Sequence, residues 1–99
     1  MIARGASADG DFVFQHVVIP VGARTAWHTH PGPQMVVVTT GTVVRESRRW
    51  PPTSAESGDA FLEEPGDVHA GYNAGDTPVE MWTMTVVPAG AEPAHAVEG

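Results

Sequence analysis

Apolar residues in this chain gather in short runs rich in β-branched and aromatic side chains, and glycine and proline separate the runs. The clearest runs are residues 12–20, 34–47 and 78–88, and each is typical of a strand or a hairpin. The middle run contains Thr40-Gly41, where we expect the hairpin to turn. No window keeps the 3.6-residue apolar period that a helix needs. The pattern therefore predicts an all-β protein with roughly seven or eight short strands.

The remaining segments complete a single domain over residues 1–99. Residues 23–30 are expected to form a strand, and residues 48–57, which are polar and contain Pro-Pro, are expected to form a loop. Residues 1–10 are predicted to be a loose N-terminal arm. Residues 89–99 carry little apolar surface, so we expect a mobile tail.

Composition excludes several kinds of chemistry and partner. The chain has no Cys and no Lys, so thiolate sites and Schiff-base catalysis are excluded. Its net charge of −7 is the wrong sign for a nucleic-acid-binding protein. No apolar stretch resembles a secretion signal or a membrane span, so we expect a cytoplasmic protein without a membrane partner.

Three of the five histidines have a spacing that suits a metal site. His28 and His30 are two residues apart on a predicted strand, so both rings project from one face. Gln34 has the same parity and could add an amide oxygen, and His69 could come from a facing strand. A pair of histidines two residues apart is also common in proteins that bind no metal. His16 and His95 have no partner at a useful spacing and are expected to lie outside any site.

Glycines frame these histidines in two patterns. The first pattern is Gly22, His28, His30, Gln34 and Gly41, and the second is Gly58, Gly66, His69 and Asn73. In spacing they resemble the two motifs of the cupin superfamily, except that Gln34 stands where the family usually has Glu and that the second-motif proline is shifted by one residue. The resemblance implies a single cupin-type β-barrel, a double-sheet jelly roll, with one divalent metal. The implied metal ligands are His28, His30 and His69, with Gln34 in the Glu position.

Residues 22–34 are similar to a subgroup of small bacterial cupins with a His, His, Gln, His set, which includes manganese-dependent hydroxynitrile lyases. The implied cofactor is Mn, Fe or Zn, and imidazole ligands suit Ni and Cu as well. If Gln34 replaces the carboxylate, a divalent ion keeps a charge of about +2 instead of +1 and becomes a stronger Lewis acid. Gln34 could equally be no ligand at all, which leaves an open three-His site.

These features lead to one main hypothesis and two alternatives. The main hypothesis is a metal-dependent enzyme that acts on a small hydroxy or carbonyl compound by Lewis-acid chemistry, as a lyase, isomerase or cyclase. The first alternative is an iron-dependent dioxygenase of the three-His cupin type. The second is a non-catalytic module that binds a small molecule or a metal.

The surroundings of the metal are less defined by the sequence. The residues that could line a pocket, with ordinary core or dimer packing as the alternative, are Val36, Val38, Phe61, Met81, Trp82 and Met84. Glu63 and Glu80 are the acids that could move protons, but we expect both carboxylates to face solvent. The outermost strands of so short a chain would leave open edges, so we expect a homodimer.

Overall fold

The computed structural model describes residues 3–98 and contains ten strands, which confirms the all-β prediction. Among the described residues, no helix has the length and apolar character needed to cross a membrane. The strands are β1 (Ala3–Ser7), β2 (Gly10–Ile19), β3 (His28–Thr29), β4 (Gln34–Thr40), β5 (Thr42–Ser47), β6 (Thr53–Glu56), β7 (Ala60–Glu63), β8 (His69–Tyr72), β9 (Val79–Val87) and β10 (His95–Ala96).

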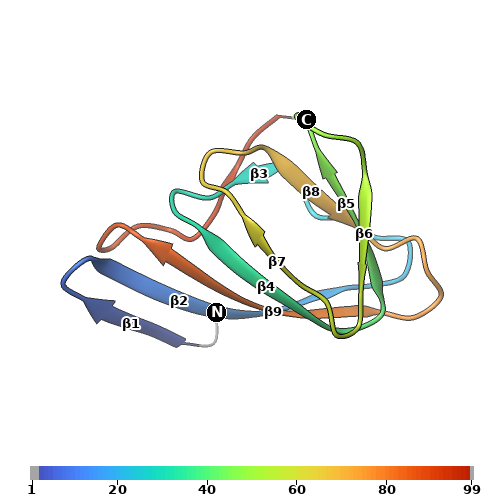
Figure 1. Cartoon of the computed structure of the whole chain (residues 1–99), viewed down its shortest axis with the longest axis horizontal. Coiled ribbons are helices and arrows are strands. Elements are labelled where there is room, and N and C mark those ends of the chain that lie inside the picture. The colour runs from blue at the N-terminus through green and yellow to red at the C-terminus, as the bar shows by residue number, and fades with distance from the viewer. Residues whose placement is uncertain (1–2, 99) are drawn as a thin grey trace.

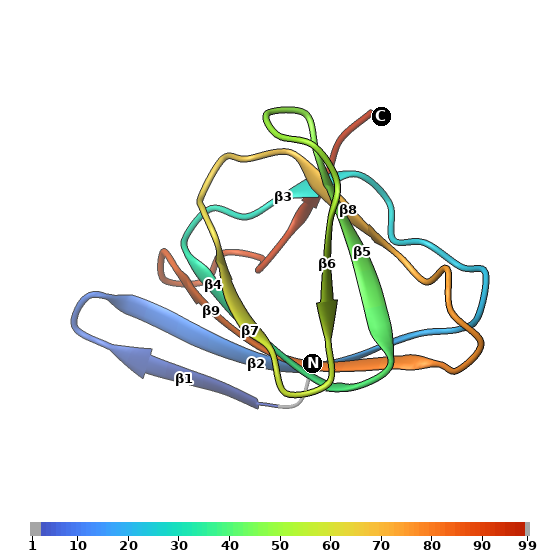
Figure 2. The same ribbon diagram turned by 45° about the vertical axis from the view of Figure 1, so that its right-hand side comes forward.

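The strands form two antiparallel sheets of five strands each (Figures 1 and 2). The first sheet has the order β1-β2-β9-β4-β7, and the second has the order β10-β3-β8-β5-β6. Figure 1 shows the β1–β2 hairpin extending past the end of the second sheet. The two sheets face each other in the arrangement of a double-stranded β-helix, as predicted.

The core lies between the sheets and consists of small and medium aliphatic side chains. Along β4 and β9, residues alternate between buried and exposed, so each strand turns every second side chain inward. The buried cluster consists of Ile19, Val36, Val38, Val43, Ala55, Val79 and Met81. This core fills one end of the space between the sheets and leaves the other end for polar side chains.

The hairpin predicted at Thr40-Gly41 connects β4 to β5 across the two sheets. Gly41 has a φ of 81°, a conformation that favours glycine. A Cβ at this position would lie 2.6 Å from the carbonyl oxygen of Pro78, so the close approach of the neighbouring chain also requires glycine.

One predicted strand and one predicted loop differ from expectation. Only His28–Thr29 of residues 23–30 forms a ladder strand, preceded by a single bridge between Arg24 and Tyr72. Conversely, β6 lies within residues 48–57, which were predicted to be a loop. This edge strand pairs with β5 and buries one apolar side chain, Ala55, so its sequence shows almost no alternation.

Both ends of the described chain form strands where no strand was predicted. β1 pairs along its whole length with β2, and an ion pair of 2.8 Å joins Arg4 to Asp11 across the hairpin. At the other end, β10 pairs with β3. The mobility expected for residues 89–99 stays a prediction, and Met1, Ile2 and Gly99 lie outside the described residues.

The outward face of the first sheet carries a row of exposed apolar side chains. Strand register places Phe14 beside Met84, Met84 beside Met35, and Met35 beside Leu62, so the row crosses four strands. In the adjacent row Trp82, which is 45% exposed, lies beside Val37. We call these six residues the outer apolar face.

Candidate metal centre

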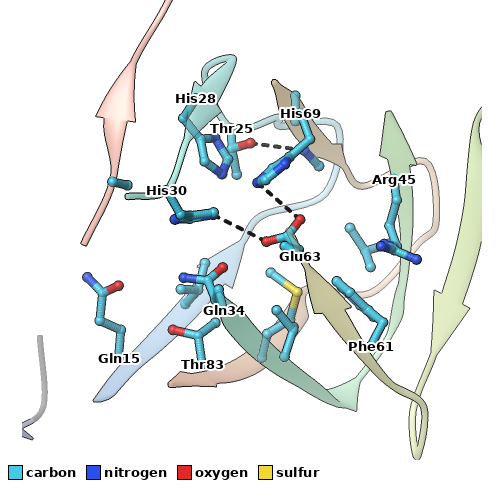
Figure 3. A pocket seen from close by; sticks show the side chains of 17 residues that line it. Gln15, Thr25, His28, His30, Gln34, Arg45, Phe61, Glu63, His69 and Thr83 are labelled. Atoms are coloured by element: carbon cyan, nitrogen blue, oxygen red, sulfur yellow. Dashed lines mark hydrogen bonds and ion pairs between the residues drawn. The ribbon is translucent and has the colours of Figure 1, made fainter. Parts of the chain in front are cut away.

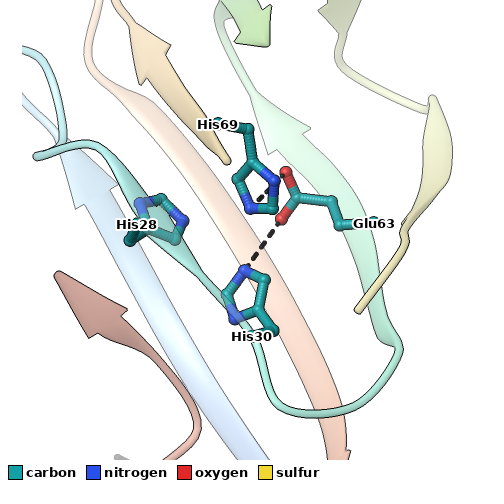
Figure 4. Close-up of side chains that lie close together, drawn as sticks. All are labelled: His28, His30, Glu63 and His69. Carbon is teal, nitrogen blue, oxygen red and sulfur yellow. Dashed lines mark ion pairs between the residues drawn. The ribbon is translucent and has the colours of Figure 1, made fainter. Parts of the chain in front are cut away.

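Three histidines and one glutamate meet between the sheets, at the end left open by the core (Figure 4). His28 lies in β3, His30 follows this strand, and His69 begins β8, where it is the register partner of His28. Glu63 ends β7 on the opposite sheet. The predicted ligands His28, His30 and His69 therefore come together, and Glu63 joins them.

The three imidazole rings are packed closely against one another. Their centroids are 5.0 Å apart for His28 and His30, 4.6 Å for His28 and His69, and 4.9 Å for His30 and His69. His30 and His69 are almost completely buried. Burial lowers the pKa of His28, against a smaller opposing effect from the backbone of Ala26, which favours a neutral ring.

Backbone carbonyls determine which nitrogen of two rings carries the proton. The Nδ1 atom of His28 lies 2.7 Å from the carbonyl oxygen of Ala26, and that of His30 lies 2.8 Å from the carbonyl oxygen of Pro93. Because a carbonyl oxygen only accepts, each Nδ1 must donate a proton. The Nε2 atom of each neutral ring then presents a lone pair. This is the outer hydrogen bonding that orients histidine ligands in metal sites.

Glu63 points into this cluster, so the expectation of a solvent-facing carboxylate was wrong. Its oxygens lie 3.4 Å from Nε2 of His30 and 3.2 Å from Nε2 of His69. Burial raises the pKa of Glu63, but positive charge on these two imidazoles would outweigh burial and lower the pKa to about 2. When both rings are neutral, a metal ion between the groups would supply that positive charge instead. The physical reason for the inward direction is register: Glu63 is paired with Gln34, whose side chain faces the interior.

The donor set fits a divalent transition metal. Ligand atoms of all four residues lie within 4.8 Å of one another, slightly wider than the roughly 3.4 Å between ligands of a tetrahedral site. Nε2 of His30 and Nε2 of His69 are buried and have no partner with hydrogen-bond geometry among the described residues. A lone pair of His30 facing a carboxylate oxygen is repulsive unless a cation lies between them. One metal ion would satisfy all four residues at once.

Gln34 lies in the same cavity, but its role as a ligand stays a prediction. The side chain is buried, and its amide nitrogen donates a 2.7 Å hydrogen bond to Oγ1 of Thr85. The amide oxygen of Gln34 takes no part in that bond and accepts nothing from Thr85. The sequence predicts a centre in which an amide replaces the carboxylate, and Glu63 corrects that prediction: with this side chain, a bound divalent ion would have a net charge of about +1.

The cluster forms one wall of a cavity of about 190 Å³ (Figure 3). Three of the predicted pocket residues, Val36, Phe61 and Met81, line it. The other three predicted residues do not line this cavity. Val38 is fully buried in the core, and Trp82 and Met84 belong to the outer apolar face, because alternation on β9 turns Met81 and Thr83 inward instead.

Several polar residues of the cavity were not predicted. Arg45 lines it from β5, and Thr83 has a buried Oγ1 without a partner among the described residues. Parity with the buried Val43 could have indicated the inward direction of Arg45. His16 stacks on Trp82 outside the cavity, and Glu80 is exposed beside it as expected. His95 is exposed on β10.

Comparisons with known proteins agree with this architecture. No curated protein matches the chain. A cupin-like protein from Thermotoga maritima is 26% identical, with 100% of this chain and 89% of that chain covered and a TM-score of 0.74. A protein with a double-stranded β-helix domain from Klebsiella pneumoniae is also 26% identical, with 95% and 79% covered and a TM-score of 0.69.

A DMSP lyase from Ruegeria pomeroyi has a TM-score of 0.78 at 19% identity, which shows a common fold. The match covers 91% of this chain but only 44% of that chain, so this protein spans less than half the length of the lyase. A family model described as "Cupin domain" matches residues 15–88. This match covers well over half of the chain and contains the whole histidine–glutamate cluster, and the chain therefore belongs to the cupin family.

Proposed function

We propose that this protein is a metal-dependent enzyme that acts on a small hydroxy or carbonyl compound as a lyase, isomerase or cyclase. The observation that carries the proposal is the convergence of His28, His30, Glu63 and His69 on the wall of a cavity between the two sheets. When bound, a divalent ion of Mn, Fe or Zn type supplies a Lewis acid that polarises a substrate oxygen.

The chain's own residues give the cavity two parts with different roles. Val36, Phe61 and Met81 form an apolar wall that excludes water and surrounds a hydrocarbon substituent. Thr83 adds a hydroxyl without a partner among residues 3–98, which is free to donate to a substrate oxygen. A volume of about 190 Å³ holds roughly six water molecules, so the substrate is smaller than a typical drug-sized ligand.

Glu63 takes part in this site as a metal ligand rather than as a proton acceptor. Its two oxygens lie beside Nε2 of His30 and Nε2 of His69, in the direction that these rings offer to an ion. A carboxylate in that position leaves the Lewis acidity close to that of a site with the usual cupin Glu. The similarity to a DMSP lyase, at 19% identity, shows the fold alone.

The test begins with elemental analysis of protein purified without a metal-binding tag. The expected result is near-stoichiometric Mn or Zn, followed by turnover of small hydroxynitriles or hydroxycarbonyl compounds. His69→Ala is the inactive control, and His16→Ala, on the outside of the sheet, is the matched control that retains activity. The proposal is overturned if no ion binds after reconstitution, or if His69→Ala turns over as well as the unmodified protein. Stoichiometric iron with oxygen uptake on 1,3-diketones would replace it with the dioxygenase alternative.

A further inference from the structure

Arg45 lies where two cavities meet. It projects from β5 on the same face as the buried Val43, toward the space between the sheets. It lines the cavity of the metal centre and also an adjoining pocket of about 420 Å³, which includes Trp50. Glu63 and His69 line both spaces as well. Arg45 therefore shares the lining of one cavity with the histidine–glutamate cluster (Figure 3).

The guanidinium of Arg45 is held by aromatic rings rather than by hydrogen bonds. Its central carbon lies 3.6 Å from the ring centroid of Phe61 and 5.3 Å from that of Trp50. Its Nε is buried and has no hydrogen-bond partner among residues 3–98. Stacking uses the face of the guanidinium, whereas the N–H groups point outward in its plane. The buried Nε thus lacks a partner that a carboxylate oxygen could supply.

The neighbouring carboxylates are engaged elsewhere. Glu63 faces His30 and His69, and Asp67 accepts from the hydroxyl of Ser47 at 3.2 Å. Burial lowers the pKa of Arg45, against smaller opposing effects from Glu63 and Asp67, and neither acid forms an ion pair with it among the described residues. A half-buried cation with unused donors is an arrangement that an incoming anion completes.

The charge balance of the loaded centre also favours an anion. The three histidines and Gln34 are neutral, so a divalent ion with Glu63 leaves one positive charge, and Arg45 adds a second. Asp67 and Glu64 line the adjoining pocket and balance these charges there, whereas Arg45 and Glu63 are the charged side chains that line the cavity of the metal centre. That cavity therefore retains a local positive charge that a neutral substrate would leave unbalanced in a region of low dielectric.

We propose that Arg45 binds the carboxylate of the substrate and that the substrate class is small hydroxy or keto carboxylic acids. This inference rests on the proposed function. The proposed function places a hydroxyl or carbonyl oxygen of the substrate at the metal, and the inference adds a carboxylate at Arg45. The fork of N–H donors matches a carboxylate in two parallel hydrogen bonds, which a neutral amide or nitrile cannot form in the same way. Phe61 and Trp50 hold the fork in a fixed orientation.

Calorimetric titration tests this with 2-hydroxyisobutyrate and its neutral amide as probes, on metal-loaded and on metal-free protein. The carboxylate is expected to bind about tenfold or more tightly than the amide. Arg45→Met should remove that difference, and Arg45→Lys should retain part of it. Arg24→Gln, an exposed arginine paired with Glu46, is the control that keeps the full difference. Thermal melting and metal content show whether each variant folds. If Arg45→Met does not fold, the comparison of Arg45→Lys with the unmodified protein decides the test.

Equal binding of acid and amide, or an unchanged preference in the Arg45 variants, would overturn the role of Arg45. Failure of the proposed function has a different signature. Preference for the carboxylate that depends on Arg45 in metal-free protein, with no turnover of any hydroxy or keto acid after loading, would leave the binding role standing without the enzyme.

Discussion

Gln34 and Glu63 are register partners on β4 and β7, and both side chains face the space between the sheets. The motif position that usually holds a carboxylate in this family is an amide here, and the carboxylate is found directly across the strand pair. Side chains opposite each other in an antiparallel pair lie about 5 Å apart, so an acid at either position can reach one ion.

This relationship predicts that the carboxylate can be exchanged between the two positions. Glu63→Gln should weaken metal binding by more than the roughly 10–100-fold that outer hydrogen-bond partners contribute. Adding Gln34→Glu to that variant should restore much of the affinity, because the acid returns to the same cavity from the paired strand. Chelator competition measures both constants. Unchanged affinity in Glu63→Gln would show that its carboxylate is not a ligand.

The histidines are expected to divide into one group that holds metal and one that does not. His28→Ala and His69→Ala should lose stoichiometric metal, because each removes one of the converging nitrogens. His16→Ala should keep it, since His16 packs on Trp82 on the outer side of the sheet. Elemental analysis after gel filtration gives the metal content. Retention of metal by His69→Ala would contradict the assigned centre.

The C-terminal segment should contribute to the metal centre through a carbonyl group and through strand pairing. The carbonyl oxygen of Pro93 accepts a hydrogen bond from Nδ1 of His30, and β10 pairs with β3. Deleting residues 93–99 should therefore lower metal affinity about 10–100-fold. His95→Ala, which changes an exposed side chain of the same segment, should not. Circular dichroism verifies folding, and equal affinity of the truncated and full chains would refute the role of Pro93.

Protonation of Asp11 should lower the stability of the protein in acid. The backbone N–H of Gly90, and next Arg4, lower the pKa of Asp11 from its ordinary value of 3.8. Its contribution to stability is therefore complete above the unfolded pKa and is lost as pH falls through the lower folded pKa. Asp11→Asn should melt at a lower temperature near neutral pH, with the gap closing in acid. A gap that is constant with pH would contradict this linkage.

The outer apolar face is expected to join two copies of this chain. Exposed apolar patches of this kind mark interfaces, and a patch whose own six residues are uncharged can pack against its own copy in a two-fold dimer. Light scattering should give twice the 10.4 kDa chain mass. Trp82→Glu should give the monomer, whereas Val21→Glu, at an exposed loop position, should not. A monomeric unmodified protein at micromolar concentration would exclude the dimer.

Local patterns were sufficient to predict much of the fold and the histidines of the centre. Parity on one strand placed His28 and His30 on the same face, and the glycine at position 41 marked the turn between β4 and β5. These inferences needed only neighbouring residues. The family resemblance then connected His69, which lies far away in sequence.

Glu63 could not be placed in the same way, because its surroundings depend on long-range pairing. Whether Glu63 faces inward is decided by the register of β7 on β4, and one residue of slip would turn it to solvent. The strand β6 has a similar origin, since its order comes from pairing with β5 rather than from its own sequence.

The four residues of the centre are divided between the sheets, with His28 and His69 in one and Glu63 in the other. The centre can therefore assemble only after the two sheets have closed on each other, late in folding. A metal ion bound there would link the two sheets, and its bonds to one sheet would have to break before the sheets could separate. Contacts that form after the transition state chiefly slow unfolding, so metal loading should lengthen the lifetime of the folded chain more than it speeds its formation.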